Sequence, residues 1–440
     1  MKLYAMGHAI TARGCTLKWK IRYLAAAALA AVLVAGPAAP AQPAPAVAEP
    51  ALSLNETLAL ARGDQPTVTA FEREAVASEE AAVAARTLPD PQIIAGVRDY
   101  PVTGNNALSP TADNFTMYTI GVMREQVRRS RREAEASRLR AEAVVSRAEG
   151  TAEEREIQRN AMIAWIEAVE AAAKQRLLAR ILHDLEAGRE IMEAGIPTGA
   201  STPALALQAQ AEIALAEAQL AEARGAEARA RAELARWIGA AAHRPLPDTI
   251  PDIAIPATMP DHPGPDDHPH VLVAEAQEQA ARRQVDVARA ERRPNLSWQV
   301  MYGWRPEYGD LVSAQVTIPL QINRGRLQNR RIAEASARAD AARLRAEGVR
   351  REVRSSYLRA FADHRSAGAQ LAVLRDRAIP ALEASFEAAE ARYAGGQGSL
   401  ELPLNIVRRY VEAHIQSVEQ QGRRARAAAE IIYLTGETGQ

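Results

Sequence analysis

LVSAQVTIPLQINRGRLQNRRIAEA, residues 311–335, is the stretch that decides the fold of this chain. In its first ten residues apolar side chains such as Val316 and Ile318 alternate with polar ones, which is the period of a β-strand. At Pro319 the period changes to about 3.6, and a helical pattern continues to Gly396. A strand joined to a helix of about 75 residues is not the layout of a globular domain, in which helices average about 12 residues.

An earlier part of the chain, residues 115–195, follows the same plan. Three pairs of positions match at one offset: Ile120 with Val316, Arg155 with Arg351, and Trp165 with Phe361. The pattern indicates duplication of one large unit, made of a helix, two strands, a long helix and a return helix. In each half, the first helix and the return helix have a summed length close to that of the long helix. We therefore expect antiparallel helical columns of coiled-coil type, each with a strand hairpin at one end.

The strands are expected at residues 92–100, 115–123, 296–303 and 311–320, with a loop at 304–310 and long helices beginning near 123 and 320. Each strand has one mainly apolar face, formed by Ile93, Val97, Tyr118, Ile120, Val122, Trp298, Val300, Tyr302, Val316 and Ile318. The alternation fits a transmembrane β-barrel with a wet lumen and these residues facing lipid. It fits equally a hairpin packed on a soluble core. Four strands cannot close a barrel alone, so insertion into a membrane would require an oligomer.

The domain boundaries follow from this plan. We expect a signal peptide (1–41), a disordered linker (42–51), a first repeat (52–242) with its strand hairpin at 92–123, a linker (243–267), and a second repeat (268–440) with its strand hairpin at 296–320. Residues 23–35 are apolar, follow Lys18, Lys20 and Arg22, and precede the cleavage-like motif Ala39-Pro40-Ala41. A retained membrane anchor is the alternative for this segment.

Composition excludes some classes of protein. The 440 residues carry a formal net charge of +0, without the basic surplus that a nucleic-acid partner requires. Only 4% of residues are aromatic, which suits long helices packed through small side chains. The single cysteine, Cys15, precedes the apolar segment, so we expect no disulfide and no lipid anchor in the mature chain.

Four stretches carry a family resemblance. They are LSLNETLALARGDQP (52–66), LPDPQIIAGV (88–97), VTIPLQINRGRLQNRRIAEA (316–335) and ARYAGGQGSLELPLNIVRRYVEA (391–413). In order and spacing they resemble the TolC-like outer-membrane efflux proteins, and LPDPQ and IPLxxxRGR look most like the heavy-metal branch of CzcC and CusC type. The chain departs from the family pattern in MREQVRRSRREAEA (123–136) after the second strand, and it lacks the cysteine of the lipidated members.

The resemblance implies a mainly α protein with a small β part. It implies a homotrimer in which each subunit gives four strands to a shared transmembrane β-barrel in the outer membrane, while the helices form an α-barrel tunnel in the periplasm. A periplasmic adaptor, an inner-membrane pump and outer-membrane lipid would be the partners. The chain would be a passive exit duct, not an enzyme, with no cofactor and with heavy-metal cations as one substrate class. A periplasmic adaptor and a soluble coiled-coil scaffold are the alternatives.

Arginines follow the second and fourth strands. Arg124 and Arg128 begin the first run, and Arg324 and Arg326 begin its counterpart. They are either a solvated helix face or a basic collar at the junction of barrel and tunnel, which would touch lipid head groups or line the lumen.

Two glycine-containing turns are expected to form the periplasmic tips. The tip glycines are Gly195, Gly199, Gly395 and Gly396. Glu193 and Glu401 flank the turns and are candidates for acidic rings that gate the pore and favour cations.

One histidine-rich segment resembles a metal site by composition. It holds Asp261, His262, Asp266, Asp267, His268 and His270. We favour a linker and helix start at His268-Pro269 instead, and expect no metal. His183 and His364 lie in long helices without an expected partner, which favours solvated or packing roles.

Overall fold

The computed structural model describes residues 49–63, 65–111, 115–197, 201–255, 267–306, 308–394 and 401–436. The expected signal peptide and most of the first linker lie outside these residues. None of the described helices combines the length and the apolar content needed to cross a membrane as a helix.

Helices make up most of the described chain. They are α1 (Leu54–Ala61), α2 (Pro66–Arg86), α3 (Arg129–Gly195), α4 (Pro203–Ile238), the 3₁₀ turn η1 (Gly239–His243), α5 (Pro269–Ala290), α6 (Gln328–Val373), the π-helical turn η2 (Leu374–Ala378), α7 (Ile379–Ala394) and α8 (Glu401–Thr435). The starts have local causes: the Ser53 hydroxyl accepts a hydrogen bond from the Glu56 amide at 3.2 Å, and prolines open α2, α4 and α5.

The strands differ from expectation at their ends. They are β1 (Gln92–Arg98), β2 (Met117–Gln126), β3 (Leu296–Arg305) and β4 (Tyr308–Thr317). The expected loop 304–310 is wrong, because Arg305 pairs with Tyr308 and the ladder continues almost to the turn. The expected helix starts are also too early, since β2 runs on to Gln126 and α6 begins only at Gln328. Strand pairing across the sheet stabilises residues 123–126 and 308–310, which local periodicity assigns to helix or loop. The late start of α6 has another form, since residues 318–327 have no strand partner and 322–327 form turns.

The second long helix is irregular at one turn. Residues 374–378 form a π-helical turn between α6 and α7. Helical residues nevertheless run without a break from 328 to 394, as the single long helix expected from the sequence requires. Pro380 explains the irregular turn, because proline lacks an amide hydrogen and its ring clashes with the carbonyl four residues earlier, on Asp376. A wider turn relieves that clash without ending the helix.

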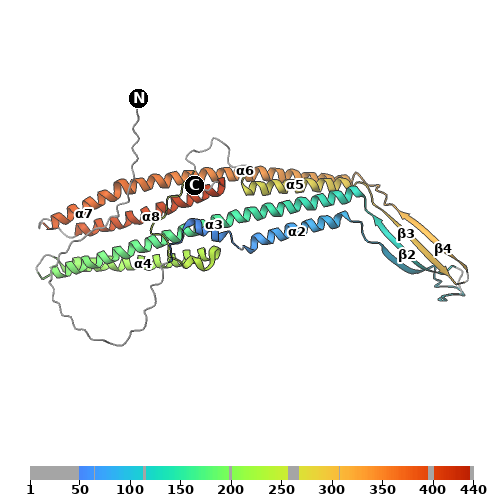
Figure 1. Cartoon of the computed structure of the whole chain (residues 1–440), viewed down its shortest axis with the longest axis horizontal. Coiled ribbons are helices and arrows are strands. Elements are labelled where there is room, and N and C mark those ends of the chain that lie inside the picture. The colour runs from blue at the N-terminus through green and yellow to red at the C-terminus, as the bar shows by residue number, and fades with distance from the viewer. Residues whose placement is uncertain are drawn as a thin grey trace, which may run out of the picture. The chain divides into compact units, whose positions relative to one another are not determined.

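Within residues 49–436 the two repeats form neighbouring columns (Figure 1). α2 covers the part of α3 near the sheet, and α4 covers the part away from it; both contact α3 extensively. In the second repeat α5 and α8 cover α6 in the same way. The short helices therefore lie end to end along each long helix, as the length argument predicts.

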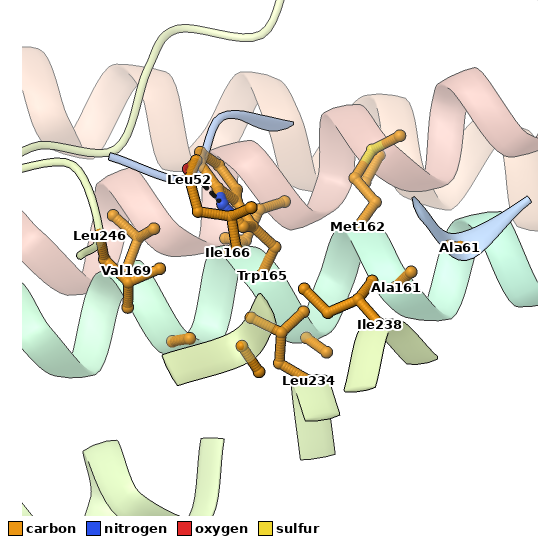
Figure 2. Packing of buried hydrophobic residues seen from close by; sticks show 14 of the residues in the cluster. Leu52, Ala61, Ala161, Met162, Trp165, Ile166, Val169, Leu234, Ile238 and Leu246 are labelled. Atoms are coloured by element: carbon orange, nitrogen blue, oxygen red, sulfur yellow. Dashed lines mark hydrogen bonds between the residues drawn. The ribbon is translucent and has the colours of Figure 1, made fainter. Parts of the chain in front are cut away.

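The largest hydrophobic cluster surrounds Trp165 of α3 (Figure 2). Trp165 is 1% exposed, and its indole Nε1 donates to the Leu52 carbonyl at 3.0 Å. Leu234 and Ile238 of α4 and Leu246 from the following segment pack beside it. The cluster thus joins the chain before α1, the long helix, the return helix and the segment after η1.

The four strands form one antiparallel sheet in the order β1-β2-β3-β4 at one end of the helices (Figure 1). β2 of the first repeat pairs with β3 of the second over nine residue pairs, from Tyr118 opposite Trp304 to Gln126 opposite Leu296. The two expected hairpins are therefore halves of a single sheet.

Candidate functional site

The apolar face of the sheet is continuous across all four strands. Ile93 lies opposite Val122, Ile120 opposite Tyr302, and Trp298 opposite Val316. Residues directly opposite one another share a face, so the register places all of the predicted lipid-facing strand residues on one side. Ile318 comes just after the end of β4.

That face is uncovered in the single chain. The exposed fractions are 78% for Ile93, 57% for Ile120 and 61% for Val316. Apolar patches of this extent on a protein surface mark an interface with another protein or with lipid. Contact with lipid itself stays a prediction.

The opposite face is closely packed and more polar. Met117 lies over Gly303, and Met301 lies over Gly121, so a side chain at either glycine would collide with a methionine. Thr119 is buried and donates its hydroxyl to the Gly96 carbonyl at 3.0 Å. The two faces thus differ as the outer and inner walls of a closed sheet would.

The edges of the sheet are open. Among the described residues β1 pairs only with β2, and β4 pairs only with β3. Each edge therefore presents a row of backbone groups that can pair with another strand.

The arginines after β2 have structural partners. The Arg124 Nε donates to the Pro89 carbonyl at 2.9 Å, and the Arg128 Nε donates to the Pro294 carbonyl at 2.7 Å. Each bond holds the chain just before a strand, β1 in one case and β3 in the other. Arg124 itself lies within β2, opposite Trp298, and not in a helix as expected.

The arginines before α6 have different surroundings. Arg324 and Arg326 are exposed in the segment 318–327, which separates β4 from α6. The two runs, equivalent in sequence, therefore differ in structure: the first holds the strand connections, and the second is presented at the surface.

At the far end of the helices, Gly195 is the last residue of α3 and Thr202 caps α4 with its hydroxyl, 3.4 Å from the Leu205 amide. Glu193 is half-exposed and forms an ion pair with Arg189 at 2.5 Å. Gly199, Gly395, Gly396 and the side chain of Glu401 lie outside the described residues. The acidic rings expected from Glu193 and Glu401 therefore stay a prediction.

His268 serves the start of α5, as expected from the sequence. Its Nδ1 accepts a hydrogen bond from the His270 amide at 3.3 Å, and its ring, 1% exposed, packs against the Tyr433 ring at a centroid distance of 5.0 Å. Burial, followed by the charges of His270 and Arg155, lowers the pKa of His268 to about 4. Burial likewise raises the pKa of Tyr433 to about 12.

No cluster of three or more metal-ligating side chains occurs among the described residues. Asp261, His262 and Asp266 of the histidine-rich segment lie outside that part of the chain. His183 is exposed. The expectation that His364 has no partner is wrong, because the Arg424 Nε lies 3.3 Å from its Nε2 and donates to it.

Sequence reasoning missed a charge cluster between α3 and α8. Glu170, almost buried, pairs with Arg426 at 2.5 Å and with Lys174 at 3.1 Å, and Lys174 also reaches Glu419. Gly422 permits this approach, since a side chain there would collide with the Glu170 carboxylate. A glycine within a helix was the available signal. The cluster joins the two repeats.

A polar groove lies next to this cluster, between α6 and α8. Its volume is about 540 Å³, and Asp363, Gln370, Gln420 and Arg423 are among the residues that line it. It is open and holds no arrangement of a nucleophile with a base among its described lining residues.

Comparisons with known proteins agree with this architecture. The outer membrane efflux protein family matches residues 266–437, whereas no curated protein matches the chain. Among solved structures, the outer membrane protein VceC from Vibrio cholerae is 19% identical, with a TM-score of 0.70 over 88% of this chain and 97% of VceC. CusC is 16% identical, with a TM-score of 0.74 over 87% of this chain and 91% of CusC. The CmeC outer membrane channel of Campylobacter jejuni is 13% identical, with a TM-score of 0.73 over 87% and 85%. The chain therefore has the fold of these outer-membrane proteins, and residues 266–437 match the outer membrane efflux protein family.

Proposed function

We propose that this chain is the outer-membrane channel of a tripartite efflux system and acts as a passive exit duct. One observation carries the proposal: a sheet with a continuous exposed apolar face and two open edges lies at the end of long paired helices. In water such a sheet would expose both apolar side chains and unpaired backbone groups. In an outer membrane the lipid covers the apolar face, and neighbouring copies pair with the edges.

A homotrimer would supply partners for both open edges of the sheet. Each copy supplies four strands, which are too few to close a barrel, and three copies fall within the range of strand numbers found in outer-membrane barrels. β4 of one copy would pair with β1 of the next, so that no edge remains in lipid. The face with Met117, Thr119 and Met301 would then line the lumen, and the apolar face would meet the bilayer.

The helical columns would extend the barrel as a tunnel through the periplasm. The sequence resemblance and the likeness to the named channels support this arrangement and its partners, an inner-membrane pump and a periplasmic adaptor. The duct performs no reaction, because the pump drives transport. Heavy-metal cations are the substrate class that we propose, on the resemblance of LPDPQ and IPLxxxRGR to the heavy-metal branch.

We propose further that Glu193 and Glu401 form acidic rings at the periplasmic tip. They flank the turns between long and return helices, and a ring of carboxylates in a narrow pore favours cations. In the single chain Glu193 forms an ion pair with Arg189. In an acidic ring this ion pair would either break or bring Arg189 into the ring beside Glu193.

Conductance of the purified full chain in planar lipid bilayers tests the function. We expect discrete conductance steps with a preference for cations. Glu193→Gln with Glu401→Gln should lower the cation-to-anion permeability ratio roughly two- to fivefold, because two of the ring charges per subunit are removed. Glu190→Gln, an exposed residue on the same helix, is the matched control. An unchanged permeability ratio in the double variant would refute the acidic gate. Absence of conductance in the native chain would refute the channel function.

An adaptor or a soluble coiled-coil scaffold is the competing function. Adaptors carry one helical hairpin and separate β-rich domains, whereas this chain has a helical hairpin in each repeat and a single sheet built from both. Fractionation separates the classes. A duct stays with the outer membrane until detergent is added, and a scaffold is released by buffer alone.

A further inference from the structure

The apolar stripe of β4 does not stop where the strand ends. In the sequence every second residue of this stripe is apolar, and the alternation continues past the end of β4 into a segment whose residues 322–327 form turns. The series is Val312, Ala314, Val316, Ile318, Leu320 and Ile322, and the next two positions of the alternation are Arg324 and Arg326. Leu320 and Ile322 are 83% and 85% exposed, more than any apolar residue of the strands.

The backbone of this segment limits where it can lie. β4 ends at Thr317, and residues 318–327 have no strand pairing. Turns close the second part of the segment, where the Arg326 and Leu327 amides donate to the Asn323 carbonyl at 3.0 and 2.9 Å. Irregular backbone of this kind does not occur facing lipid in the hydrocarbon core of a bilayer. Exposed leucine and isoleucine next to arginine are typical of segments that lie in the interfacial layer, where apolar side chains enter the acyl boundary and cations reach the phosphates.

The segment 318–327 has several exposed arginines as neighbours in the chain and at the end of α5. Exposed arginines gather near the segment, at Arg292, Arg293, Arg324, Arg326 and Arg330. Residue 321 lies against the end of α5, since the Gln321 side chain donates to the Glu291 carbonyl at 3.2 Å. The Glu291 carboxylate is already paired with Arg131 at 3.1 Å and faces Arg331 at 3.8 Å.

Two further carboxylates, those of Asp90 and Glu125, lie at a pocket near the start of the sheet. Gln92, Ser297 and Thr317 line the same pocket. The register places Gln92, Glu125 and Ser297 on the face opposite the apolar stripe. Glu125 therefore adjoins the polar face, whereas Arg324 and Arg326 follow the apolar series of β4 in the sequence.

The first repeat lacks an equivalent surface. At the offset of the duplication Leu320 corresponds to Arg124 and Arg324 corresponds to Arg128. Both of these arginines donate to backbone carbonyls, of Pro89 and Pro294. The segment 318–327 is thus a feature of the second repeat alone.

We propose that the segment 318–327 is an interfacial anchor that binds anionic phospholipid head groups at the periplasmic rim of the outer membrane. The proposal rests on the proposed function, because that function places the sheet in a bilayer. Leu320 and Ile322 enter the acyl boundary, and Arg324 and Arg326 bind the lipid phosphates. Phosphatidylglycerol is the probe that carries this chemistry.

The test uses the full chain reconstituted in nanodiscs of phosphatidylcholine with phosphatidylglycerol, and spin-labelled forms of each lipid. The measured quantity is the preference of the protein boundary for labelled phosphatidylglycerol over labelled phosphatidylcholine. A cation near an anionic membrane surface contributes about a fivefold factor in binding. We expect a preference of about fivefold or more in the native chain, and its loss in the Arg324→Gln, Arg326→Gln variant.

Two further variants identify the cause. Arg324→Lys with Arg326→Lys keeps the charges and should restore most of the preference. Arg345→Gln with Arg365→Gln removes two exposed arginines from α6 and should leave it unchanged. Added salt should lower the preference of the native chain, because surface charges are screened.

An unaltered preference in the Arg324→Gln, Arg326→Gln variant overturns the anchor. If that variant keeps its lipid preference and changes conductance instead, the two arginines line the lumen, which also overturns it. Conductance of the native chain separates this failure from failure of the function. A channel that conducts but shows no lipid preference would refute the anchor alone. A chain that does not enter the bilayer would refute the proposed function.

Discussion

The long helix of the first repeat and that of the second are copies in sequence but have different surroundings. Buried positions correspond at one offset, as in Ile157 with Val353 and Ala164 with Ala360. α3 runs without interruption and packs against α2, α4, α5 and α8. α6 and α7 are separated by a π-helical turn, and the main partners of α6 are α5 and α8.

The difference shows in which side chains remain exposed. Leu344, Leu358 and Val373 of α6 are 57%, 42% and 51% exposed. α3 is the central helix of the described chain, whereas α6 has a side that no described element covers. Val144 and Ile191 of α3 are exposed as well, at 53% and 52%, so the difference is one of degree. The long helix of the first repeat has more partners within its own chain than that of the second.

The largest expected effect comes from the core position that the repeats share. Trp165→Ala should lower the free energy of unfolding by about 3–5 kcal/mol, because a fully buried ring is replaced by a cavity. Phe361→Ala, at the equivalent and only partly buried position, should cost roughly 1–2 kcal/mol. Denaturant unfolding of the detergent-solubilised chain, followed by circular dichroism, measures both. Equal losses of unfolding free energy in the two variants would contradict the difference in packing between the two long helices.

The next effect concerns the helix starts Gln65-Pro66 and His268-Pro269. His268 has an ordinary pKa of 6.5 when unfolded and about 4 when folded, so the unfolded chain binds its proton first as the pH falls. Stability is therefore complete above about pH 6.5 and falls between pH 6.5 and 4, by about 2–3 kcal/mol. His268→Gln, which installs the residue of the first repeat, should flatten this slope in unfolding experiments across that pH range.

The residual slope has identifiable sources. Burial also lowers the pKa of His364 and of His414, with the same sign. A variant slope equal to that of the native chain would mean that these two histidines, and not His268, cause the pH dependence.

A smaller effect distinguishes the arginine runs. Arg128→Gln removes the hydrogen bond to the Pro294 carbonyl and should cost about 1 kcal/mol of stability. Arg324→Gln should change stability by less than about 0.5 kcal/mol, because an exposed side chain is replaced. Thermal unfolding of the two variants in the same detergent compares them. A larger loss for Arg324→Gln would reverse the structural assignment of the two runs.

The smallest effect is expected at the π-helical turn. Pro380→Ala restores an amide hydrogen that can donate to the Asp376 carbonyl, so residues 374–380 should exchange their amide hydrogens about three- to tenfold more slowly. Hydrogen exchange read by mass spectrometry measures this segment, and the corresponding part of α3 is the internal control. Unaltered exchange would mean that packing, and not Pro380, sets the wide turn.

Much of the architecture could be predicted from the residues. The positions of four strands, the apolar alternation and the order of long and return helices are local patterns, and the structure has them. The ends of β2 and β3 could not be predicted, because the ladder between β2 and β3 joins residues far apart in the sequence. Pro380 was visible in the sequence as a helix-breaking residue, but whether it ends a helix or widens one turn depends on packing.

The candidate surfaces divide in the same way. Alternation alone grouped Ile93, Ile120 and Val316 on one kind of face, since side chains in a strand alternate with a period of two. It could not assign different roles to Arg128 and Arg324, because both follow a strand and precede a long helix. Only the bond from Arg128 to the Pro294 carbonyl, contributed by the other repeat, separates them.

The sequence by itself determined the duplication, the long helices and the amphipathic strands, because these depend on periodicity within one segment. The tertiary structure decided that the two hairpins form a single sheet, that α3 packs against more helices than α6, and that Glu170 is almost buried among Arg426 and Lys174. Each of these depends on contacts between repeats. The energy of such contacts is set by which surfaces meet, and no local pattern records that.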